Sequence, residues 1–446
     1  MNRINQYSDA FTERMKTLLP DDYEAFIKSL DGYSPTSVRM NATKPTGKFA
    51  DEENISWCNT GKYLNERPSF TFDPIFHAGS YYVQEASSMF LEEVWKQLNL
   101  GSQPLKVLDL CAAPGGKSTH LLSLMSAESL LVTNELIPNR NKILQQNIIK
   151  WGYANCIITQ NKPEDFAGFE NYFDVILIDA PCSGEGLFRK DKDAIGEWSE
   201  KNVATCAVRQ KDIVTHAAAC LKPGGHLIYS TCTYEPVEND ENIAWMQQLG
   251  LQSLSLDLSK YPGVTKTQYG CQFYPHRIKG EGFYIAALQK EGTAHAYPSA
   301  PVNNKKLPLL SPALQGYLRQ PEAFTELKKN DFIFAMPLWM MNDFTILEKR
   351  LYIRNAGILA GSIKGTDFLP AHDLALSNHI RKDIPSVELS EEEAITYLRC
   401  ETPKINSDLR GWCLATYQGL NLGWMKLMPG RLNNYFPKDW RILKRA

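Results

Sequence analysis

Two cysteines follow two apolar runs of the sequence, and each lies in a short segment of small residues. Cys182 occurs in DAPCSGEG after the run FDVILID, and Cys232 occurs in YSTCTYEPVEN after GGHLI. Asp179 precedes the first cysteine by three residues, at the end of the same predicted strand. A lone cysteine is usually an inert small hydrophobe. Two thiols at the ends of nearby strands, with an acid beside them, instead indicate covalent chemistry on one substrate.

A third segment, LKVLDLCAAPGGKSTH, predicts a strand, a loop of small residues and the start of a helix. Ligands of open α/β sheets bind outside the carboxyl ends of the strands, so this loop is the expected cofactor position. Most of its members have little or no side chain, which lets backbone N–H groups approach a ligand closely. The loop consists of Cys111, Ala112, Ala113, Pro114, Gly115, Gly116 and Lys117.

The identity of the ligand depends on this loop and on the next predicted strand. A phosphate-binding loop needs G-x-x-x-x-G-K-[ST], and CAAPGGKS departs from it at the first position, where Cys111 replaces glycine. The dinucleotide pattern G-x-G-x-x-G is absent. Glu135, near the end of LLVTNEL, lies about twenty residues after the glycines, where an acid binds the hydroxyls of an adenosine ribose. S-adenosylmethionine (SAM) has this ribose and no phosphates, so SAM is the predicted cofactor and a P-loop-like NTPase is the alternative.

Two thiols and an acid suit methyl transfer to a carbon atom. The C5 atom of a pyrimidine is too weak a nucleophile to take a methyl group directly, and a thiolate bound at C6 activates it by covalent catalysis. The C5 proton and the thiol must then leave, which requires a second group. An acid such as Asp179 near N3 and N4 of the ring would stabilise the adduct and select cytosine. A base inside a helix must first be unstacked.

The middle of the chain, residues 76–290, alternates short apolar runs with amphipathic helical patterns. This alternation predicts βαβ units and a parallel, doubly wound α/β sheet of Rossmann-like type. Residues 1–75 are expected to form a small α+β lead domain. A segment rich in Pro, Ala and Asn marks residues 291–312 as a linker. An intermediate domain at 313–385 and a compact β-rich module at 386–446 are predicted to follow.

Composition excludes several classes of protein. The net charge is −2, so the chain as a whole is not a basic nucleic-acid binder. The ten cysteines include no C-x-x-C pair, and the polar start MNRINQYSDA is no signal peptide, which predicts free thiols in a reducing cytoplasm and no metal site. No apolar run reaches the roughly 18 residues of a membrane helix, so no membrane partner is expected. No coiled coil is evident, which favours a monomer.

The quoted segments also carry a resemblance. DLCAAPGGKS, DAPCSGEG and STCTYEPVEN closely resemble the motifs of the RNA cytosine-C5 methyltransferases of the Nol1/Nop2/Sun type, and HAGSYYVQEASSM and HRIKGEGFYIAAL extend the similarity over about residues 70–290. GLFRKDKDAIGEWS and the tail GWMKLMPGRLNNYFPKDWR resemble more narrowly the bacterial branch that modifies 16S ribosomal RNA. In that branch the C-terminal piece is a PUA-like RNA-binding module, and the lead domain would assist RNA binding.

The resemblance implies roles for individual residues. Cys232 would be the nucleophile at C6, and Cys182 would help to release the methylated product. Asp179 would contact both cofactor and base. The loop from Cys111 to Lys117 would line the methionine end of SAM, and Glu135 would hold its ribose. Family members often have an Asp just after the third strand for the adenine amino group, whereas this chain has Asn161 first and Asp165 four residues later, so Asn161 is preferred.

RNA binding must come from local patches, because the net charge is near neutral. Arg189 and Lys190 follow the first cysteine motif and would border the pocket. The tail holds the basic residues Lys426, Arg431, Lys438 and Arg441, interleaved with aromatic residues that are more often core than stacking platform. The segment FAMPLWMM is predicted to lie in the hydrophobic core.

Two alternative functions stay open. One is the same chemistry on transfer RNA. The other is a non-catalytic RNA assembly factor, which would require that some of the catalytic residues be missing.

Overall fold

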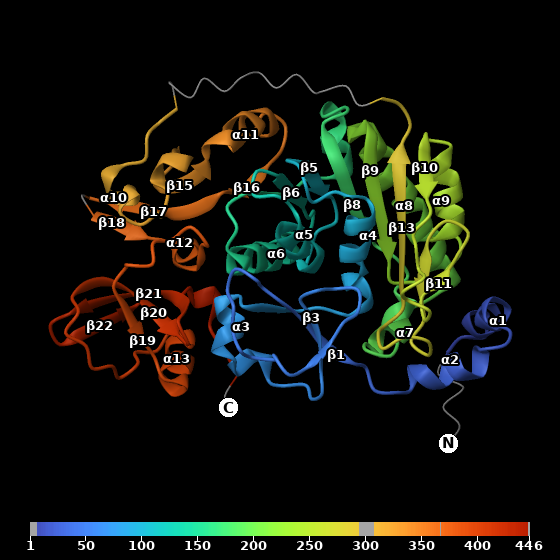
Figure 1. Cartoon of the computed structure of the whole chain (residues 1–446), viewed down its shortest axis with the longest axis horizontal. Helices are drawn as coiled ribbons and strands as arrows, with labels where there is room; N and C mark the ends of the chain where they lie inside the picture. Colours follow the sequence, from blue (N-terminus) through green and yellow to red (C-terminus); the bar gives the residue numbers. More distant parts are fainter. Residues whose placement is uncertain (1–6, 294–306, 366, 445–446) are drawn as a thin grey trace.

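The computed structural model describes residues 7–293, 307–365 and 367–444. Four β-sheets organise these residues (Figure 1): a large central sheet at the right, a small N-terminal sheet at the bottom and two C-terminal sheets at the left. The predicted linker at 291–312 falls largely on residues 294–306, which lie outside the described residues.

The N-terminal segment is a helical hairpin followed by an antiparallel sheet. Ser8 caps the first helix, its Oγ accepting a hydrogen bond from the backbone N–H of Phe11 at 3.2 Å. The buried side chains of both helices pack on Phe188, Trp198 and Tyr234 from the middle of the chain. The last strand of the sheet ends at residue 83, so this sheet extends past residue 75. The elements are α1 (Asp9–Leu18), α2 (Tyr23–Leu30), β1 (Thr36–Met40), β2 (Glu53–Asn54), β3 (Gly61–Leu64), α3 (Pro74–Ala78) and β4 (Tyr81–Val83), in the sheet order β2-β3-β1-β4.

The core of the central sheet is five parallel strands in the order β7-β6-β5-β8-β9, as the βαβ alternation predicts. These strands are apolar and almost fully buried, because helices cover both faces of the sheet. Antiparallel strands extend the sheet beyond β9. The strands are β5 (Lys106–Asp109), β6 (Leu130–Asn134), β7 (Cys156–Thr159), β8 (Phe173–Asp179), β9 (Leu221–Thr231), β10 (Leu251–Leu254), β11 (Thr265–Lys266), β12 (Cys271–Phe273) and β13 (Phe283–Lys290).

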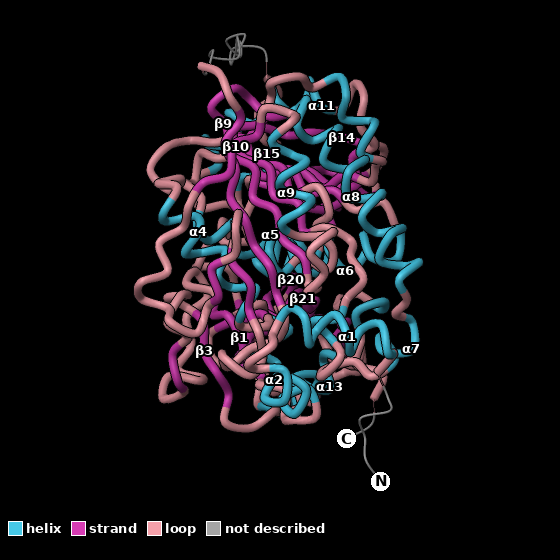
Figure 2. The backbone as a smooth tube through the Cα atoms, turned by 90° about the vertical axis from the view of Figure 1, so that its right-hand side faces the viewer, coloured by secondary structure: helices cyan, strands magenta, loops and turns pink. Residues whose placement is uncertain are grey.

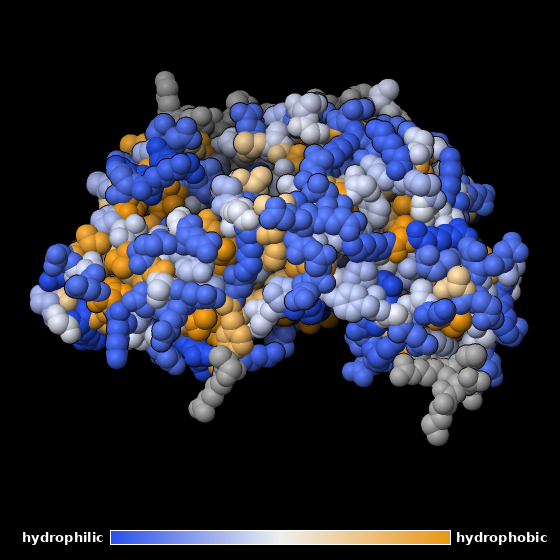
Figure 3. All heavy atoms as spheres, turned by 60° about the horizontal axis from the view of Figure 1, so that its bottom comes forward, coloured by the Kyte–Doolittle hydropathy of each residue, from blue (hydrophilic) through white to orange (hydrophobic). Residues whose placement is uncertain are grey.

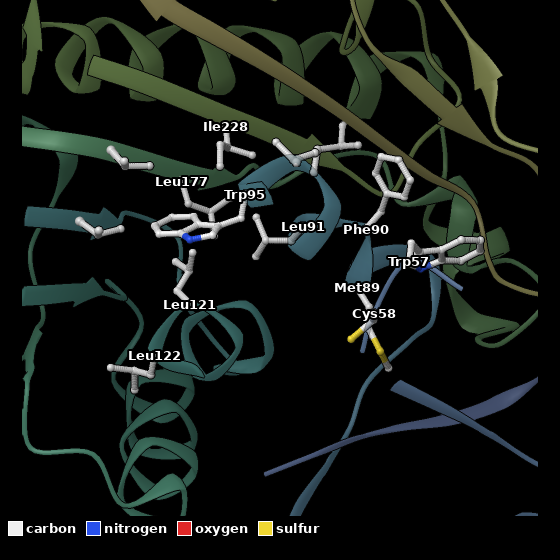
Figure 4. Close-up of a cluster of buried hydrophobic side chains, with 14 of the residues drawn as sticks. Trp57, Cys58, Met89, Phe90, Leu91, Trp95, Leu121, Leu122, Leu177 and Ile228 are labelled. Carbon is white, nitrogen blue, oxygen red and sulfur yellow. The ribbon is translucent and has the colours of Figure 1, made fainter. Parts of the chain in front are cut away.

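Two hydrophobic clusters fill the spaces between the sheet and its helices. One contains side chains of α4 and α5 together with Leu177 and Ile228 of the sheet, and Figure 4 shows Trp95, Leu91 and Leu121 facing these strands. The other lies under α8 and α9. Figure 2 shows α4 on one side of the strands and α8 on the other. The helices are α4 (Leu91–Gln97), α5 (Gly116–Leu124), α6 (Pro138–Trp151), α7 (Asp193–Glu197), α8 (Glu200–Cys220) and α9 (Asp240–Gln247).

The C-terminal part forms two four-stranded sheets, as expected of a β-rich region. FAMPLWMM lies in β15 and the turn after it, and Met336 and Met340 are fully buried, as predicted. The first group of elements is α10 (Pro312–Gln315), β14 (Phe324–Lys329), β15 (Phe332–Pro337), α11 (Met341–Leu347), β16 (Ile353–Ala356), β17 (Ile358–Lys364), β18 (Asp367–Pro370) and α12 (His372–Leu376). The last group is β19 (Ser386–Glu388), α13 (Glu391–Leu398), β20 (Gly411–Tyr417), β21 (Leu420–Met428) and β22 (Arg431–Asn434).

One strand of the intermediate segment leaves its own sheet. β16 pairs antiparallel with β7, with Ile353 opposite Thr159, and so becomes an edge strand of the central sheet. Residues 313–385 therefore share a sheet with the domain expected at 76–290. Among the described residues, no helix is long and apolar enough to cross a membrane.

Candidate active site

The two predicted thiols lie in contact at the carboxyl edge of the central sheet. β8 and β9 are neighbours, with Asp179 opposite Ser230, so the residues that follow these strands share one edge. The Sγ atoms of Cys182 and Cys232 are 3.3 Å apart, and the backbone N–H of Cys232 donates to Cys182 Sγ at 3.3 Å. The hydrogen bond between the two thiol side chains and burial raise the pKa of the Cys182 thiol well above its usual range. Cys182 is thereby held as a neutral thiol against the other sulfur.

Asp179 lies beside both the thiols and the cofactor loop. Its Oδ1 accepts hydrogen bonds from Ser230 Oγ at 2.8 Å and is paired with Lys117 Nζ at 2.8 Å. Lys117 also lies over the ring of Phe283, 5.0 Å from its centroid. Both contacts of the carboxylate use Oδ1, and about a third of the side chain is exposed, so Oδ2 can accept from a ligand. Lys117 thus orients the acid from the cofactor side.

Two buried glutamates hold the two cysteine loops to each other. Glu185, from the Cys182 loop, accepts from the hydroxyl of Thr233 and from the backbone N–H of Tyr234 at 2.9 Å, the two residues that follow Cys232. Glu238, from the Cys232 loop, accepts in return from the backbone N–H of Ser183 at 3.2 Å, directly after Cys182. The hydroxyls of Ser183 and Thr233 are themselves 2.9 Å apart. We call these contacts the reciprocal clamp.

The reciprocal clamp is supported from outside by two further elements. Trp198 Nε1 donates to Glu185 at 2.6 Å, and Gln210 Nε2, from α8, donates to Glu238 at 2.6 Å. Burial raises the pKa of Glu238 to about 7. Arg14 of α1 lies 3.8 Å from Glu185 and forms an ion pair with Glu235. The N-terminal hairpin therefore contributes to the position of the thiols.

We expect the substitution Glu185→Gln or Glu238→Gln to lower kcat by about 10- to 100-fold. Each replaces a carboxyl that accepts several buried hydrogen bonds by an amide that presents N–H groups to other donors, and small displacements of reacting groups cost about this much in rate. Because neither residue lines the cofactor pocket, the SAM dissociation constant should change less than about twofold, as measured by calorimetry. The matched control is Glu241→Gln, an exposed acid on α9. Equal kcat values for the variants and the control would contradict a positioning role.

The cofactor pocket has a volume of about 170 Å³ and lies between the N-terminal segment and the loop after β5. The loop contributes Cys111, Ala112, Ala113, Pro114, Gly116 and Lys117, and Asp179 lines the same pocket. Gly115 adopts a positive φ of 109°, and a Cβ atom at Gly116 would lie 3.2 Å from the ring of Tyr82. The loop is fixed from α6, where Arg140 donates to the Ala113 carbonyl at 3.0 Å and Asn147 to that of Pro114 at 2.8 Å.

The residues of this pocket fit SAM. Asp109, at the end of β5, lines the pocket with one oxygen bound by Ser118 Oγ at 2.6 Å, while its buried Oδ1 has no hydrogen-bond partner among the described residues. Burial raises the pKa of this carboxyl to about 7. A buried carboxyl with a free acceptor suits the cationic methionine end of SAM. Burial also raises the pKa of the Cys111 thiol, which keeps it neutral as a wall of the pocket.

Glu135 and Asn161 follow the next two strands, outside the lining of this pocket. One oxygen of Glu135 accepts from the N–H of Ile137 at 2.8 Å and the other lies 3.5 Å from Arg140, so the carboxylate is fixed at the end of β6. The side-chain oxygen of Asn161, which was expected to meet adenine, accepts the N–H of Tyr352 at 3.0 Å. Its amide nitrogen donates to Asp165 at 3.3 Å. Both ends of the Asn161 side chain thus have protein partners, and its contact with adenine stays a prediction.

The predicted RNA contacts fall into two groups. Arg189 is buried, paired with Glu281 at 3.0 Å and bound to the Gly280 carbonyl, so in this structure it packs two loops and is not available to RNA. Lys190 beside it is exposed. In the tail, Lys426 lies 5.4 Å from the ring centroid of Trp412, and the remaining basic residues Arg431, Lys438 and Arg441 are exposed. Trp424 is fully buried, as expected of core.

The structure adds residues to the site that sequence reasoning did not single out. Tyr82, Gln84, Glu85 and Ser88, from β4 and the segment after it, line the cofactor pocket opposite the glycine loop. Asp109 and the two glutamates of the reciprocal clamp were also missed. The available signal was the segment HAGSYYVQEASSM, whose polar residues follow an apolar stretch, and the acid inside LKVLDL.

One buried trio of metal-ligand types lies elsewhere. Cys58 Sγ is 3.8 Å from His120 Nε2, which lies 3.2 Å from a Glu92 oxygen. Metal-bound histidines normally donate their second ring N–H to an acceptor. His120 Nδ1 is buried without a partner among the described residues, and burial lowers the pKa of His120 to about 4. The trio is therefore better explained as a hydrogen-bonded part of the core.

Comparison with known proteins identifies the family. Three family models match: 16S rRNA methyltransferase RsmB/F at residues 97–289, the N-terminal domain of 16S rRNA methyltransferase RsmF at 8–86, and the RsmF PUA domain at 384–442. Ribosomal RNA small subunit methyltransferase F of Shewanella loihica is 30% identical over 441 residues, 90% of this chain and 88% of its own length. The chain belongs to the ribosomal RNA small subunit methyltransferase F family. The relative from Vibrio campbellii is 29% identical over 97% of both chains.

Membership of this RNA methyltransferase family makes the chain a SAM-dependent methyltransferase, with a C-terminal PUA domain as the sequence predicted. Solved structures agree on the fold. A methyltransferase homolog protein from Pyrococcus horikoshii is 28% identical with a TM-score of 0.54, covering 64% of this chain and 95% of its own. NSun6 from the same organism, solved with SFG, has a TM-score of 0.55 at 19% identity, covering 65% of this chain and 100% of its own, and so supports the fold alone.

Proposed function

We propose that this protein methylates C5 of a cytosine in 16S ribosomal RNA through a covalent bond between Cys232 Sγ and C6 of the base. The observation that carries the proposal is the pair of thiols 3.3 Å apart, beside an acid that also lines the cofactor pocket. A single-thiol site would suit many reactions. Two thiols in contact suit a reaction in which one sulfur must first bond to the substrate and then be released.

The thiolate of Cys232 adds to C6, and the electrons of the C5=C6 double bond make C5 nucleophilic. When bound, SAM would supply the electrophilic methyl group that C5 takes, and its sulfur would leave with the bonding electrons as S-adenosylhomocysteine. The proton on C5 then leaves to a base, its bonding electrons re-form C5=C6, and the C6–S bond breaks to return the Cys232 thiolate. Cys182 adjoins the leaving sulfur, which suits it to assist this release.

Asp179 has the position for selecting the base. Lys117 and Ser230 hold its Oδ1, which leaves Oδ2 to accept a hydrogen bond from the N4 amino group of cytosine. A uracil presents an oxygen in place of the amino group, so the same acid discriminates against it by leaving a polar group unpaired. The fixed side chain contributes this without reorganisation during the reaction.

Ribosomal RNA as the substrate is supported by the relatives and by the surface. Relatives named ribosomal RNA small subunit methyltransferase F align with up to 98% of the chain, and the PUA match adds a second RNA-binding part. Figure 3 shows the bottom of the molecule as a mostly hydrophilic face, recessed beside the lobe that holds α1 and α2. A polar, recessed face suits a charged polymer rather than an apolar partner.

The test is to incubate the protein with radiolabelled SAM and purified 16S, 23S and transfer RNA, and to map 5-methylcytosine. Label in one 16S cytosine is expected. Label only in transfer RNA would support the proposed chemistry and contradict ribosomal RNA as the substrate. Assembled small subunits are assayed in parallel, and label in a base other than cytosine, or on a position other than C5, would overturn the chemistry.

A further inference from the structure

A second cavity, of about 360 Å³, lies where the β14–β15 hairpin and α11 meet β16. This volume is within the range of sites that take a drug-sized group. Lys328 and Lys329 at the end of β14, Tyr352 and Arg354 at β16, and Glu348 after α11 line it. We call it the β16 groove. None of these residues belongs to the site described above.

The β16 groove is basic although the chain is slightly acidic. Three cationic side chains, Lys328, Lys329 and Arg354, line it together with one acid, Glu348. Lys328 is also paired with Glu326 at 3.2 Å, which leaves Lys329 and Arg354 as the cations of the lining without a carboxylate partner among the described residues. Lys349 and Arg350, both exposed, follow Glu348 directly and extend the positive surface. Asp343 of α11 is nearly buried and is paired with Lys106 at 2.5 Å, so it does not offset this charge. A local excess of this kind attracts a polyanion even when the net charge is −2.

The exposed aromatic ring of Tyr352 lies among these cationic side chains in the lining of the groove. The Tyr352 side chain is 56% exposed, whereas most tyrosines of the molecule are packed in cores. The Arg354 guanidinium lies 5.8 Å from its ring centroid and donates to its hydroxyl at 3.3 Å, which restrains the ring. An exposed aromatic ring flanked by Arg and Lys is a typical platform for a single-stranded base, because the ring stacks and the cations bind phosphates.

The groove adjoins the catalytic edge of the central sheet. The N–H of Tyr352 donates to Asn161 and its carbonyl accepts from Gln160, directly after β7, so Tyr352 lies at the carboxyl end of that strand. From β16 to β9, which leads to Cys232, the order β16-β7-β6-β5-β8-β9 contains five strand spacings. At about 4.8 Å each, the separation is about 24 Å. At a rise of about 3.4 Å per nucleotide this corresponds to about seven nucleotides of stacked strand.

We propose that the β16 groove binds a single-stranded part of the RNA substrate, with phosphates on Lys328, Lys329 and Arg354 and a base stacked on Tyr352, about seven nucleotides from the methylated base. The inference rests on the proposed function in taking RNA as the substrate, but on no detail of the cysteine chemistry. It gives the intermediate segment a role in substrate recognition separate from that of the PUA domain.

The experiment compares RNA binding by wild type, the triple variant Lys328→Glu/Lys329→Glu/Arg354→Glu, and a matched control, Lys201→Glu/Arg209→Glu/Lys260→Glu, which reverses three exposed cations elsewhere. Binding of 16S RNA is measured by filter retention over a range of salt concentrations, without turnover. We expect the groove variant to bind at least tenfold more weakly than the control. The slope of log K against log salt should be shallower by about 0.7 for each lost phosphate contact to a single strand. SAM affinity should match wild type, which reports an intact fold.

The stacking part is tested separately with Tyr352→Ala, expected to weaken RNA binding about tenfold, against Tyr352→Phe, expected to bind like wild type. Chemical protection by wild type should include nucleotides about seven from the target, and this protection should be lost in the triple variant. Equal RNA affinity and salt slope for the groove and control variants would overturn the inference. The proposed function would be contradicted, but the inference about the β16 groove would not, if the wild-type protein bound RNA through the groove and methylated no cytosine.

Discussion

The substitution Cys232→Ala is expected to abolish methyl transfer while SAM still binds. Without the sulfur, C5 of the base cannot be activated through C6, and loss of a covalent nucleophile lowers kcat by at least about a thousandfold. Cys232 lies outside the residues that line the cofactor pocket, so the SAM dissociation constant should stay within about twofold of wild type. Transfer of label from SAM to RNA measures the first quantity, and calorimetry with SAM measures the second.

The matched control for this variant is Cys206→Ala. Cys206 is a buried thiol on α8 whose Sγ contacts Asn202, and it is not part of the contact between the two paired sulfurs. Its truncation should cost about 1 kcal/mol of stability and leave turnover unchanged. Measurable turnover by Cys232→Ala at more than a few per cent of wild type would rule out Cys232 as the nucleophile.

The substitution Cys182→Ala is expected to trap the protein on its substrate. If Cys182 assists release, its removal leaves formation of the Cys232–C6 bond intact and slows the step that breaks it. The sulfurs are 3.3 Å apart, and the Cys182 thiol is kept neutral by its contact with Cys232 and by burial, both of which raise its pKa. A denaturing gel with end-labelled RNA should show a protein–RNA species that wild type shows only in trace amounts.

The double variant Cys182→Ala/Cys232→Ala is the decisive control, because it cannot form the bond and should migrate as free protein. Protease treatment of the trapped species should release the RNA. A Cys182→Ala protein that turns over normally, or that runs without bound RNA, would count against the release role. A trapped species that survives in the double variant would show that another nucleophile is used.

Much of this molecule could be predicted locally, because hydrophobic periodicity and turn residues act over a few positions. The apolar runs at β5, β6, β7, β8 and β9 lie where the alternation predicts strands, and their order follows from the right-handed crossovers of a parallel sheet. Once the strands are parallel, their carboxyl ends meet at one edge. The thiols after β8 and β9 and the loop after β5 therefore had to lie near one another.

Long-range contacts explain what local reasoning missed. The sequence predicted that Arg189 lies on the surface. In the structure its side chain is buried in an ion pair with Glu281, which is 92 positions away in the chain. Asn161 follows β7, at the position where a contact with adenine was expected. Its side-chain oxygen instead accepts a hydrogen bond from the backbone N–H of Tyr352, which lies in a segment assigned to another domain. β16 is too short for its partner to be inferred from its sequence, since edge pairing depends on which strand is exposed after folding.

The sequence by itself determined the class of fold and the family, and it supplied the proposed cofactor loop and the proposed catalytic residues, because each of these is encoded in contiguous segments. The tertiary structure alone decided how the thiols are held, through Glu185 and Glu238 reaching across between loops about fifty residues apart. It also decided that an intermediate segment completes the central sheet and lines the β16 groove. Such contacts depend on the relative placement of whole elements, which no local pattern of residues specifies.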